Sequence, residues 1–380
     1  MRILIFQTAY LGDVVLTTPL AATLRKHLPD AHIAVAVQPA WRPIFEHSGL
    51  VDQVISFDKR GADRGNLGTW RFASALKKER FDVALCPHPS FRSGLILALA
   101  GIPRRVGFHD SAGKLFFTEN VHRDTKSHEV DRVLSLAKAF DIDESGFVRQ
   151  LQMTPDPLLS ISEILSRFDI TDDDFLLVGL HPGSVWATKR WIPENFAIVA
   201  RQVAKMGPKV LVFGTDAERP LVEKIVAKAK HDRVIPVIGL HLPELIAAFT
   251  RLSLYITNDS GPMHIACALG VPTIALFGST VPALGYAPFS ERSAVVEVDR
   301  LSCRPCGPHG FNKCPLEHFK CMRNLKPQTV LLSAKIQIGG FKGTGFEKAG
   351  MPREVAVNDK DLFSVHPRGL LKKKIESETT

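Results

Sequence analysis

The side chains best suited to chemistry in this sequence gather in a few short loops. The most specific group follows the apolar segment LSLYIT and reads Asn258-Asp259-Ser260-Gly261-Pro262-Met263-His264. Asp259 or Ser260 can cap a helix whose first turn accepts Pro262. Capping alone leaves Gly261 and His264 unexplained, whereas a glycine lets the backbone approach a phosphate. The run therefore favours a phosphate site at a helix start.

A second candidate loop, HPGSVWATKRW, spans residues 181–191 after the segment LLVGL. The hydroxyls of Ser184 and Thr188 and the ammonium of Lys189 could bind a diphosphate together with backbone N–H groups. The alternative is an ordinary loop with a solvated Lys-Arg pair. Downstream, the segment VLVFG leads to TDAE at 215–218, where an acidic side chain could accept hydrogen bonds from ribose hydroxyls. Acidic residues are also common in a first helical turn.

The first loop of the chain, TAYLGD, ends at Asp13 and opens a predicted helix. There the helix dipole is expected to keep the carboxylate ionised. Asp13 could serve only as an N-cap. Its place at the tip of the first predicted strand, where doubly wound folds bind ligands, favours a functional role. The glycine fingerprint G-x-G-x-x-G occurs nowhere in the chain, so dinucleotide binding lacks its usual signature.

Four cysteines lie close together near the end of this series, at Cys303, Cys306, Cys314 and Cys321. The spacing resembles a zinc ribbon, although the second pair lacks the tight C-x2-C of usual sites. A structural zinc is one hypothesis, and a reduced cysteine-rich loop is the other. No export signal precedes the chain's first strand, so a disulfide framework is not expected.

Short apolar runs alternate with helical-period segments, which is the signature of parallel βαβ units. The predicted strands form two series: Arg2–Gln7, His32–Val37, Gln53–Phe57, Phe81–Cys86 and Arg104–Phe108, then Phe175–Leu180, Lys209–Phe213, Val234–Ile238, Leu252–Thr257 and Thr273–Phe277. We therefore expect an α/β protein with two Rossmann-like doubly wound domains, over 1–165 and 175–335, and ligands in a cleft at the carboxyl ends of the strands. A helix predicted over 15–27 contains Pro19, so it should be kinked or start late. Residues 339–380 read as a flexible basic tail.

Composition sets the limits on the class of protein. The chain has 380 residues, 45% hydrophobic and 23% charged, which suits an ordinary folded protein with more than one domain. The longest apolar stretch is about half of the ~20 residues that a membrane span needs. The formal net charge of +9 suits anionic partners such as nucleotides or a phosphorylated glycolipid, or simply a basic enzyme.

Together these elements resemble one enzyme family. The Gly12-Asp13 turn, the TKRW element at 188–191, Glu218, and the NDSGPMH run at 258–264 resemble glycosyltransferase family 9, the bacterial ADP-heptose:lipopolysaccharide heptosyltransferases. The segment CRPCGPHGFNKCPLEHFKCM looks like the one found in the heptosyltransferase II branch. The resemblance covers roughly residues 1–335.

The resemblance implies a GT-B fold and an inverting transfer of heptose from ADP-heptose to the inner-core oligosaccharide of lipopolysaccharide. The domain over 1–165 would bind the acceptor, and the domain over 175–335 the nucleotide sugar. Asp13 would be the general base, Lys189 would stabilise the departing diphosphate, and Glu218 would hold the ribose. The remaining donor-binding candidates are Ser184, Thr188, Asp259, Ser260, Gly261 and His264.

No D-x-D element lies near the donor motifs, and a lysine with a helix N-terminus can supply the positive charge, so no cofactor is expected. Nucleic acid is not an expected partner. A glycolipid acceptor implies a cytoplasmic enzyme that can attach to the inner face of the inner membrane through cations between Arg300 and Lys326 and at 372–374. The alternatives are another donor or acceptor, a sugar-nucleotide epimerase, or a noncatalytic sugar-nucleotide-binding protein.

Overall fold

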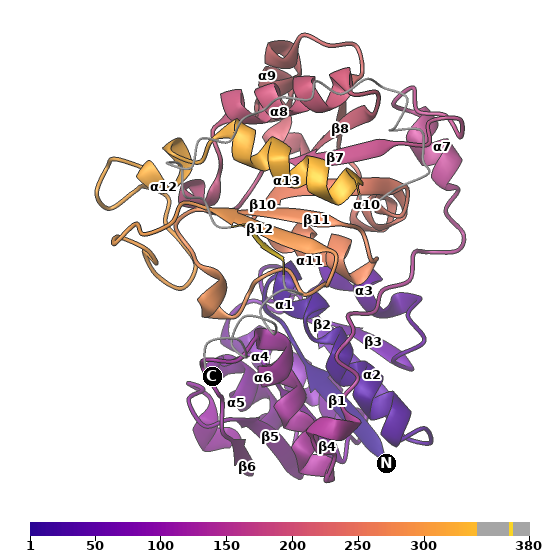
Figure 1. The fold of residues 1–380 in the computed structure, drawn as a ribbon. Helices are drawn as coiled ribbons and strands as arrows, with labels where there is room; N and C mark the ends of the chain where they lie inside the picture. The colour runs from indigo at the N-terminus through magenta and orange to yellow at the C-terminus, as the bar shows by residue number, and fades with distance from the viewer. Residues whose placement is uncertain (340–364, 368–380) are drawn as a thin grey trace, which may run out of the picture. The chain divides into compact units, whose positions relative to one another are not determined.

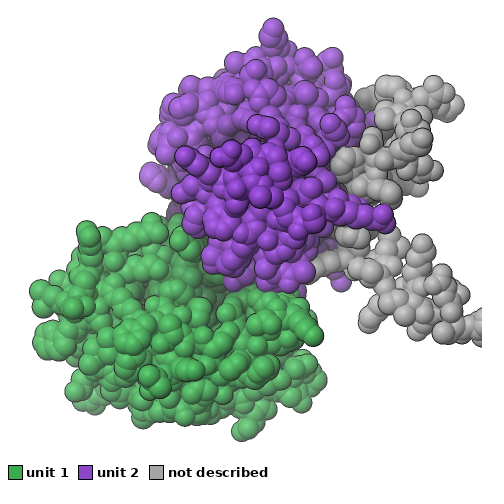
Figure 2. Space-filling view, turned by 90° about the vertical axis from the view of Figure 1, so that its left-hand side faces the viewer, with its two compact units in different colours: residues 1–157 green, residues 158–380 purple. Residues whose placement is uncertain are grey.

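A computed structural model describes residues 1–339 and 365–367 of the chain. The chain divides into two compact units, residues 1–157 and 158–380, which Figure 2 shows in green and purple. Each unit is built around its own mainly parallel sheet, so each is described separately.

The sheet of the first unit has six parallel strands in the order β3-β2-β1-β4-β5-β6. Its strands are β1 (Arg2–Phe6), β2 (His32–Val37), β3 (Gln53–Ser56), β4 (Val83–Cys86), β5 (Arg104–Phe108) and β6 (Glu119–Val121). In β1, which pairs with both β2 and β4, every residue from Ile3 to Phe6 is buried. A strand covered on both faces needs apolar side chains at successive positions, which is why β1 reads as the continuous run ILIF.

Helices pack beside this sheet (Figure 1). They are α1 (Leu11–Val15), α2 (Thr18–His27), α3 (Pro43–Glu46), α4 (Gly65–Lys78), α5 (Phe91–Leu99) and α6 (Glu129–Leu134). The helix predicted over 15–27 begins late, at Thr18 of α2, because Pro19 has no N–H to donate and therefore lies in the first turn. The late start of this helix is confirmed.

The second unit repeats the arrangement. Its sheet runs in the order β13-β12-β11-β10-β7-β8-β9, and β13 alone is antiparallel to its neighbour. The strands are β7 (Leu177–His181), β8 (Lys209–Gly214), β9 (Val234–Ile238), β10 (Leu252–Asn258), β11 (Thr273–Phe277), β12 (Ser293–Glu297) and β13 (Val365–Pro367). Its helices are α7 (Ile161–Ser166), α8 (Pro193–Lys205), α9 (Arg219–Ala229), α10 (Leu242–Phe249), α11 (Gly261–Ala268), α12 (Lys320–Arg323) and α13 (Pro327–Gly339).

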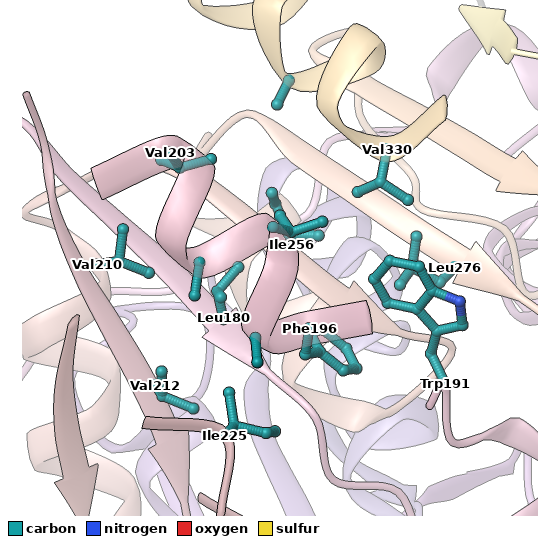
Figure 3. Packing of buried hydrophobic residues seen from close by; sticks show 14 of the residues in the cluster. Leu180, Trp191, Phe196, Val203, Val210, Val212, Ile225, Ile256, Leu276 and Val330 are labelled. Atoms are coloured by element: carbon teal, nitrogen blue, oxygen red, sulfur yellow. The ribbon is translucent and has the colours of Figure 1, made fainter. Parts of the chain in front are cut away.

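The core of the second unit lies between the sheet and the helices α8, α9 and α13 (Figures 1 and 3). Leu180 and Ile256 from the central strands meet Val330 and Phe196 from the helices. Trp191 packs into the same cluster, with its ring centroid 5.1 Å from that of Phe196 in an edge-on arrangement. The loop that carries Trp191 is therefore anchored in the core.

The structure confirms the two doubly wound domains expected from the sequence. Every predicted strand is present with its ends within two residues, whereas β6, β12 and β13 were not predicted. Of the segment expected to be a flexible tail, only the end of α13 and strand β13 are described, and the other residues lie outside the described part of the chain. In the ranges that the structure describes, no helix combines the length and apolar character needed to cross a membrane.

Strand order identifies where ligands should bind. In each unit the first strand lies between its second strand and its fourth, so the direction of winding reverses between β1 and β4 and again between β7 and β10. Doubly wound sheets bind ligands outside the carboxyl ends of the strands at this reversal. Asp13 and Lys189 lie in the segments that follow β1 and β7, and the NDSGPMH run begins at the last residue of β10 and continues into α11.

Candidate active site

In the second unit, the two main motifs meet because their strands are neighbours. His181 at the end of β7 pairs with Thr257 near the end of β10. The loop after β7 leads to the short 3-10 helix η5 (Ala187–Lys189), and the loop after β10 leads to α11. The side chain of Asn258 joins them: its Oδ1 accepts from the backbone N–H of Trp191 (3.0 Å), and its Nδ2 donates to the carbonyl of Pro182 (2.8 Å).

Lys189 and Asp259 form a nearly buried ion pair at this junction. Nζ of Lys189 lies 2.6 Å from Oδ2 of Asp259, and their side chains are 13% and 6% exposed. The hydroxyl of Thr280 donates to the same oxygen at 2.6 Å. A buried charge without a partner is costly, so each charge holds the other in place. The structure thus brings together two predicted site residues that lie far apart in the sequence.

His264, the fourth residue of α11, lies close to this pair and is buried. Burial lowers its pKa to about 4; the charge of Asp259 opposes this shift, and that of Lys189 adds to it. Among the described residues, its Nδ1 is one of the few buried polar atoms without a hydrogen-bond partner. The imidazole is therefore neutral at physiological pH.

Four more of the predicted donor-binding residues lie at this edge: Ser184, Thr188, Ser260 and Gly261. Thr188 and Ser184 make hydrogen bonds within the protein. The hydroxyl of Thr188 donates to Ser279 Oγ (3.0 Å) and accepts from the N–H of Phe311 (2.8 Å). The carbonyl of Ser184 accepts from Nε of Arg190 (2.7 Å). Ser260 is the N-cap residue of α11 without a side-chain capping bond, and Gly261 is the first helical residue. The Ser260 side chain thus leaves the helix start open to another acceptor.

Glu218 lies at the same edge, after β8. Its Oε2 accepts from the N–H and the hydroxyl of Thr215, both at 3.0 Å, and lies 3.7 Å from Nε2 of His181. Burial raises the pKa of Glu218, but the interactions with His181 and Thr215 outweigh it and lower the pKa to about 2. A Cβ at Gly183 would be only 2.0 Å from Oε1, so the carboxylate lies directly against the loop after β7.

His309 was not singled out from the sequence. Two hydrogen bonds between Phe311 and Thr188 attach the loop of His309 to the site. The N–H of Thr188 donates to the carbonyl of Phe311 (3.0 Å), and the N–H of Phe311 donates to the hydroxyl of Thr188. A Cβ at Gly310 would lie 3.4 Å from Cγ of Lys189. Burial and the charge of Lys189 lower the pKa of His309, and Asp259 raises it. The short run PHG within the cysteine segment was its only signal in the sequence.

In the first unit, Asp13 is the third residue of α1, and Tyr10 is the N-cap. Oδ2 of Asp13 accepts from the N–H of Tyr10 at 3.2 Å. Burial, and next the negative charge of Glu129, raise its pKa to about 6, against the opposing effects of the Tyr10 N–H and Arg123. The helix start was expected to keep Asp13 ionised, and with this pKa the carboxylate is still mostly ionised at neutral pH. The pKa nevertheless rises, because a five-residue helix does not offset burial near a second carboxylate.

Three further side chains around Asp13 were not predicted from the sequence: Lys59, His88 and Glu129. Nζ of Lys59 donates to the carbonyl of Thr8 at 2.6 Å, and the positive charge of Lys59 interacts with Asp13. The hydroxyl of Thr8 shares a 3.1 Å hydrogen bond with Nδ1 of His88, whose pKa burial and Lys59 lower to about 4. Glu129 is held by Arg123, whose Nη2 lies 2.9 Å from its carboxylate. These residues come from distant parts of the chain, so no local motif reveals them.

The four clustered cysteines are free thiols. They lie near one another: burial, and then the neighbouring Cys306, raise the pKa of Cys321 to about 11, with smaller contributions from the other two. In the described ranges, however, no three His, Cys, Asp or Glu side chains are arranged to hold a metal ion. The geometry therefore gives no support to the structural zinc hypothesis.

Comparison with known proteins identifies the family. Residues 69–313, well over half of the chain, match the sequence model of glycosyltransferase family 9 (heptosyltransferase). The chain belongs to glycosyltransferase family 9. As a member of this family it is a glycosyltransferase, as the motifs at the two reversal points predicted.

Similar family 9 proteins include lipooligosaccharide heptosyltransferase 2 of Campylobacter jejuni, which is 28% identical over 88% of this chain and 98% of the relative. Lipopolysaccharide heptosyltransferase 2 of Escherichia coli K12 is also 28% identical, over 78% of this chain and 88% of the relative. Among solved structures, a family 9 glycosyltransferase from Veillonella parvula is 26% identical, with a TM-score of 0.80 over 89% of this chain and 97% of the other. E. coli heptosyltransferase II, 22% identical with a TM-score of 0.73, shares the fold.

Proposed function

We propose that this family 9 glycosyltransferase transfers a heptose from ADP-heptose to the inner-core oligosaccharide of lipopolysaccharide, with inversion at the anomeric carbon. The names of its relatives support the transferred sugar and the class of acceptor. The observation that carries the proposal is the cluster at the winding reversal of the second unit. There Lys189 is fixed by Asp259 beside the start of α11, and the ionised Glu218 lies against the adjoining loop.

The second unit binds the nucleotide sugar in this proposal. The ammonium of Lys189 has three N–H donors, of which the bond to Asp259 uses one, so the others can bind the diphosphate. The N–H groups at the start of α11 add partial positive charge. Glu218 accepts hydrogen bonds from the ribose hydroxyls, which its low pKa allows at any physiological pH.

The first unit supplies the base. Asp13 takes the proton of the acceptor hydroxyl as that oxygen forms a bond to the anomeric carbon of the donor. The bond between the anomeric carbon and the diphosphate oxygen breaks, and its electron pair leaves with ADP. A single displacement inverts the anomeric configuration. A carboxylate with a pKa of about 6 is a stronger base than an ordinary aspartate and is still mostly ionised at neutral pH.

No cofactor enters this proposal, because Lys189 and the helix start can stabilise the charge that develops on the diphosphate. Chelation with EDTA followed by desalting tests this part directly, since the rate of heptose transfer should be unchanged. A rate that falls and is restored by one divalent metal would contradict it.

The decisive experiment combines the purified chain with ADP-heptose and a heptose-deficient core acceptor. Mass spectrometry should show one added heptose, and NMR should show the opposite anomeric configuration from the donor. A donor that isomerises without acceptor would favour an epimerase. Transfer from another nucleotide sugar but not from ADP-heptose would retain the enzyme class and reject the heptose. Binding of ADP-heptose without any reaction would favour the noncatalytic alternative.

A further inference from the structure

The first unit exposes several large apolar side chains near the starts of its helices α4 and α5. On α4, Leu67 is 76% exposed and Trp70 is 63% exposed. Phe91 at the start of α5 is more than half exposed, and Leu115 in the 3-10 helix η2 (Lys114–Phe116) is 85% exposed. Single exposed apolar residues are normal on a protein surface, but a group of them indicates a contact surface. We call these four side chains the apolar edge patch.

Contacts bring together the segments that carry the four side chains. Nε of Arg92, next to Phe91, donates to the hydroxyl of Thr69 on the buried side of α4 at 2.8 Å, so the starts of α4 and α5 are adjacent. Leu67 and Trp70 lie on the exposed side of α4. The ring of Phe91 meets the ring of Phe116 edge-on at 5.1 Å, which brings η2 and its Leu115 beside the start of α5. Helices α4 and α5 pack against each other along this side of the unit (Figure 1).

The loops and helix starts around the apolar edge patch have a positive charge balance. Their cations are Lys59, Arg60 and Arg64 before α4, Arg71 on α4, Arg92 on α5 and Lys114 in η2. Their carboxylates are Asp58, Asp63 and Asp110. Each carboxylate already has partners: Asp58 accepts from the backbone of its own loop, Asp63 pairs with Arg71, and Asp110 lies 3.8 Å from Arg123. Exposed aliphatic and aromatic groups ringed by cations fit the boundary of an anionic lipid bilayer.

The patch lies at the same edge of the sheet as Asp13. Parallel strands β1, β3, β4 and β5 end at one edge, and the segments that follow β3, β4 and β5 carry the patch, whereas Asp13 follows β1. Lys59, in the loop before α4, reaches the carbonyl of Thr8 in the loop before Asp13. A surface that contacted the patch would therefore lie next to the proposed base.

We propose that the apolar edge patch docks the enzyme on an anionic phospholipid surface, so that a lipid-anchored acceptor reaches Asp13 from that surface. The identity of the acceptor rests on the proposed function, whereas the docking itself does not. The cations between 300 and 326, which were predicted from the sequence to attach the chain to the membrane, form a rival surface. Arg304 is 6% exposed at its side chain and pairs with Glu297 inside the second unit, whereas the other five cations of that stretch are exposed. Lys372, Lys373 and Lys374 lie outside the described residues.

Binding to vesicles tests the docking without any reaction. We expect the full chain to sediment with vesicles of phosphatidylglycerol and phosphatidylethanolamine at low salt, and less at high salt. The double variant Leu67→Ser/Trp70→Ser should bind roughly tenfold more weakly or worse, because it removes apolar contact and no charge. The matched control is Phe175→Ser, which alters a side chain 81% exposed beside the acidic run 172–174 and should bind as the wild type does.

A substitution at Leu316, an exposed leucine of the cysteine segment, distinguishes the apolar edge patch from the cationic stretch 300–326 as the docking surface. Leu316→Ser should leave vesicle binding unchanged. If Leu316→Ser abolishes binding and the double variant does not, or if the wild type does not bind anionic vesicles, the proposal is overturned. Trp70 is the only one of the four tryptophans more than half exposed, so brominated lipids should quench the wild-type fluorescence and quench Trp70→Phe much less. Equal quenching of the two proteins would contradict the assigned surface.

Activity assays connect the docking to the acceptor. The double variant should transfer heptose to a water-soluble, deacylated acceptor at the wild-type rate and to the same acceptor in vesicles at least about tenfold more slowly. Equal loss with both acceptors would mean that the substitutions damage the fold or the site, and would remove the support for docking. Failure of the wild type on every acceptor, with vesicle binding intact, would reject the proposed function and leave the docking surface standing.

Discussion

Nζ of Lys189 lies 2.6 Å from Oδ2 of Asp259, and the same oxygen accepts a hydrogen bond from Thr280. A lysine held in this way points its remaining donors in fixed directions. An incoming diphosphate thus meets a cation whose position is already set, although part of its charge is balanced by Asp259. This arrangement separates two roles that substitutions can distinguish: binding the phosphates and keeping the ammonium in place.

Lys189→Ala should weaken ADP binding in calorimetry and cost roughly 2–4 kcal/mol of transition-state stabilisation, because it removes a charge-assisted contact to the leaving group. Asp259→Asn should bind ADP at least as tightly, since a negative charge near the diphosphate is gone, yet transfer heptose more slowly because Lys189 is less well held. Arg190→Ala is the control, because Arg190 bonds to the Ser184 carbonyl. Loss of ADP binding in the Arg190 variant but not in the Lys189 variant would reverse the assignment.

Asp13→Asn should lower turnover by roughly 10²–10⁴-fold and change ADP affinity little, because the amide cannot accept the proton of the acceptor. Burial makes ionisation of Asp13 unfavourable, so the variant should be at least as stable as the wild type at pH 7. Thermal unfolding checks that the protein remains folded. Near-normal turnover would remove Asp13 from the mechanism.

The pH dependence of kcat/KM should report the raised pKa of Asp13. The base must be ionised, so kcat/KM, which reports the ionisation of the free enzyme, should fall as the pH drops through about 6, rather than near 4 as for an ordinary aspartate. Glu129→Gln removes the negative charge that raises this pKa, so the acid limb should move to lower pH. A limb that stays in place in the Glu129 variant would show that another group controls it.

Glu218→Gln tests the ribose contact. Loss of the carboxylate charge should weaken ADP binding by about 1.5–3 kcal/mol, the range for hydrogen bonds to charged groups. Inorganic pyrophosphate has no ribose, so its affinity should not change and serves as the control ligand. If both ligands lose affinity equally, Glu218 acts by supporting the loop at Gly183 instead of by binding the nucleoside.

His309→Ala tests whether the loop from the cysteine segment belongs to the donor site. We expect weaker binding of ADP, because His309 lies within electrostatic range of Lys189 and Asp259. His318→Ala is the control, since that ring accepts from the N–H of Lys320 at 3.0 Å in the same segment. Equal ADP affinity in the wild type and both variants would show that His309 does not take part in donor binding.

Much of the fold was readable from the sequence. Strands buried on both faces need unbroken apolar runs, so β1 and β11 stand out as RILIF and TIALF. The short strand β6 (Glu119–Val121) has one apolar residue in three, and β13 pairs with β12 from a charged segment, so neither carries that pattern. The NDSGPMH run and the loop at 181–191 were recognisable because ligand loops follow strand ends directly.

The sequence by itself determined the two doubly wound units, the loops that carry the site and the family. Only the tertiary structure decided which of those residues meet. Lys189 and Asp259 pair because β7 and β10 are neighbours in the sheet, and strand order is not written in local patterns. The Asp13 pKa rises because burial and Glu129, from a distant helix, outweigh the local helix start. Local chemistry sets what a side chain can do, but long-range packing sets its solvent, its charged neighbours and hence its protonation state.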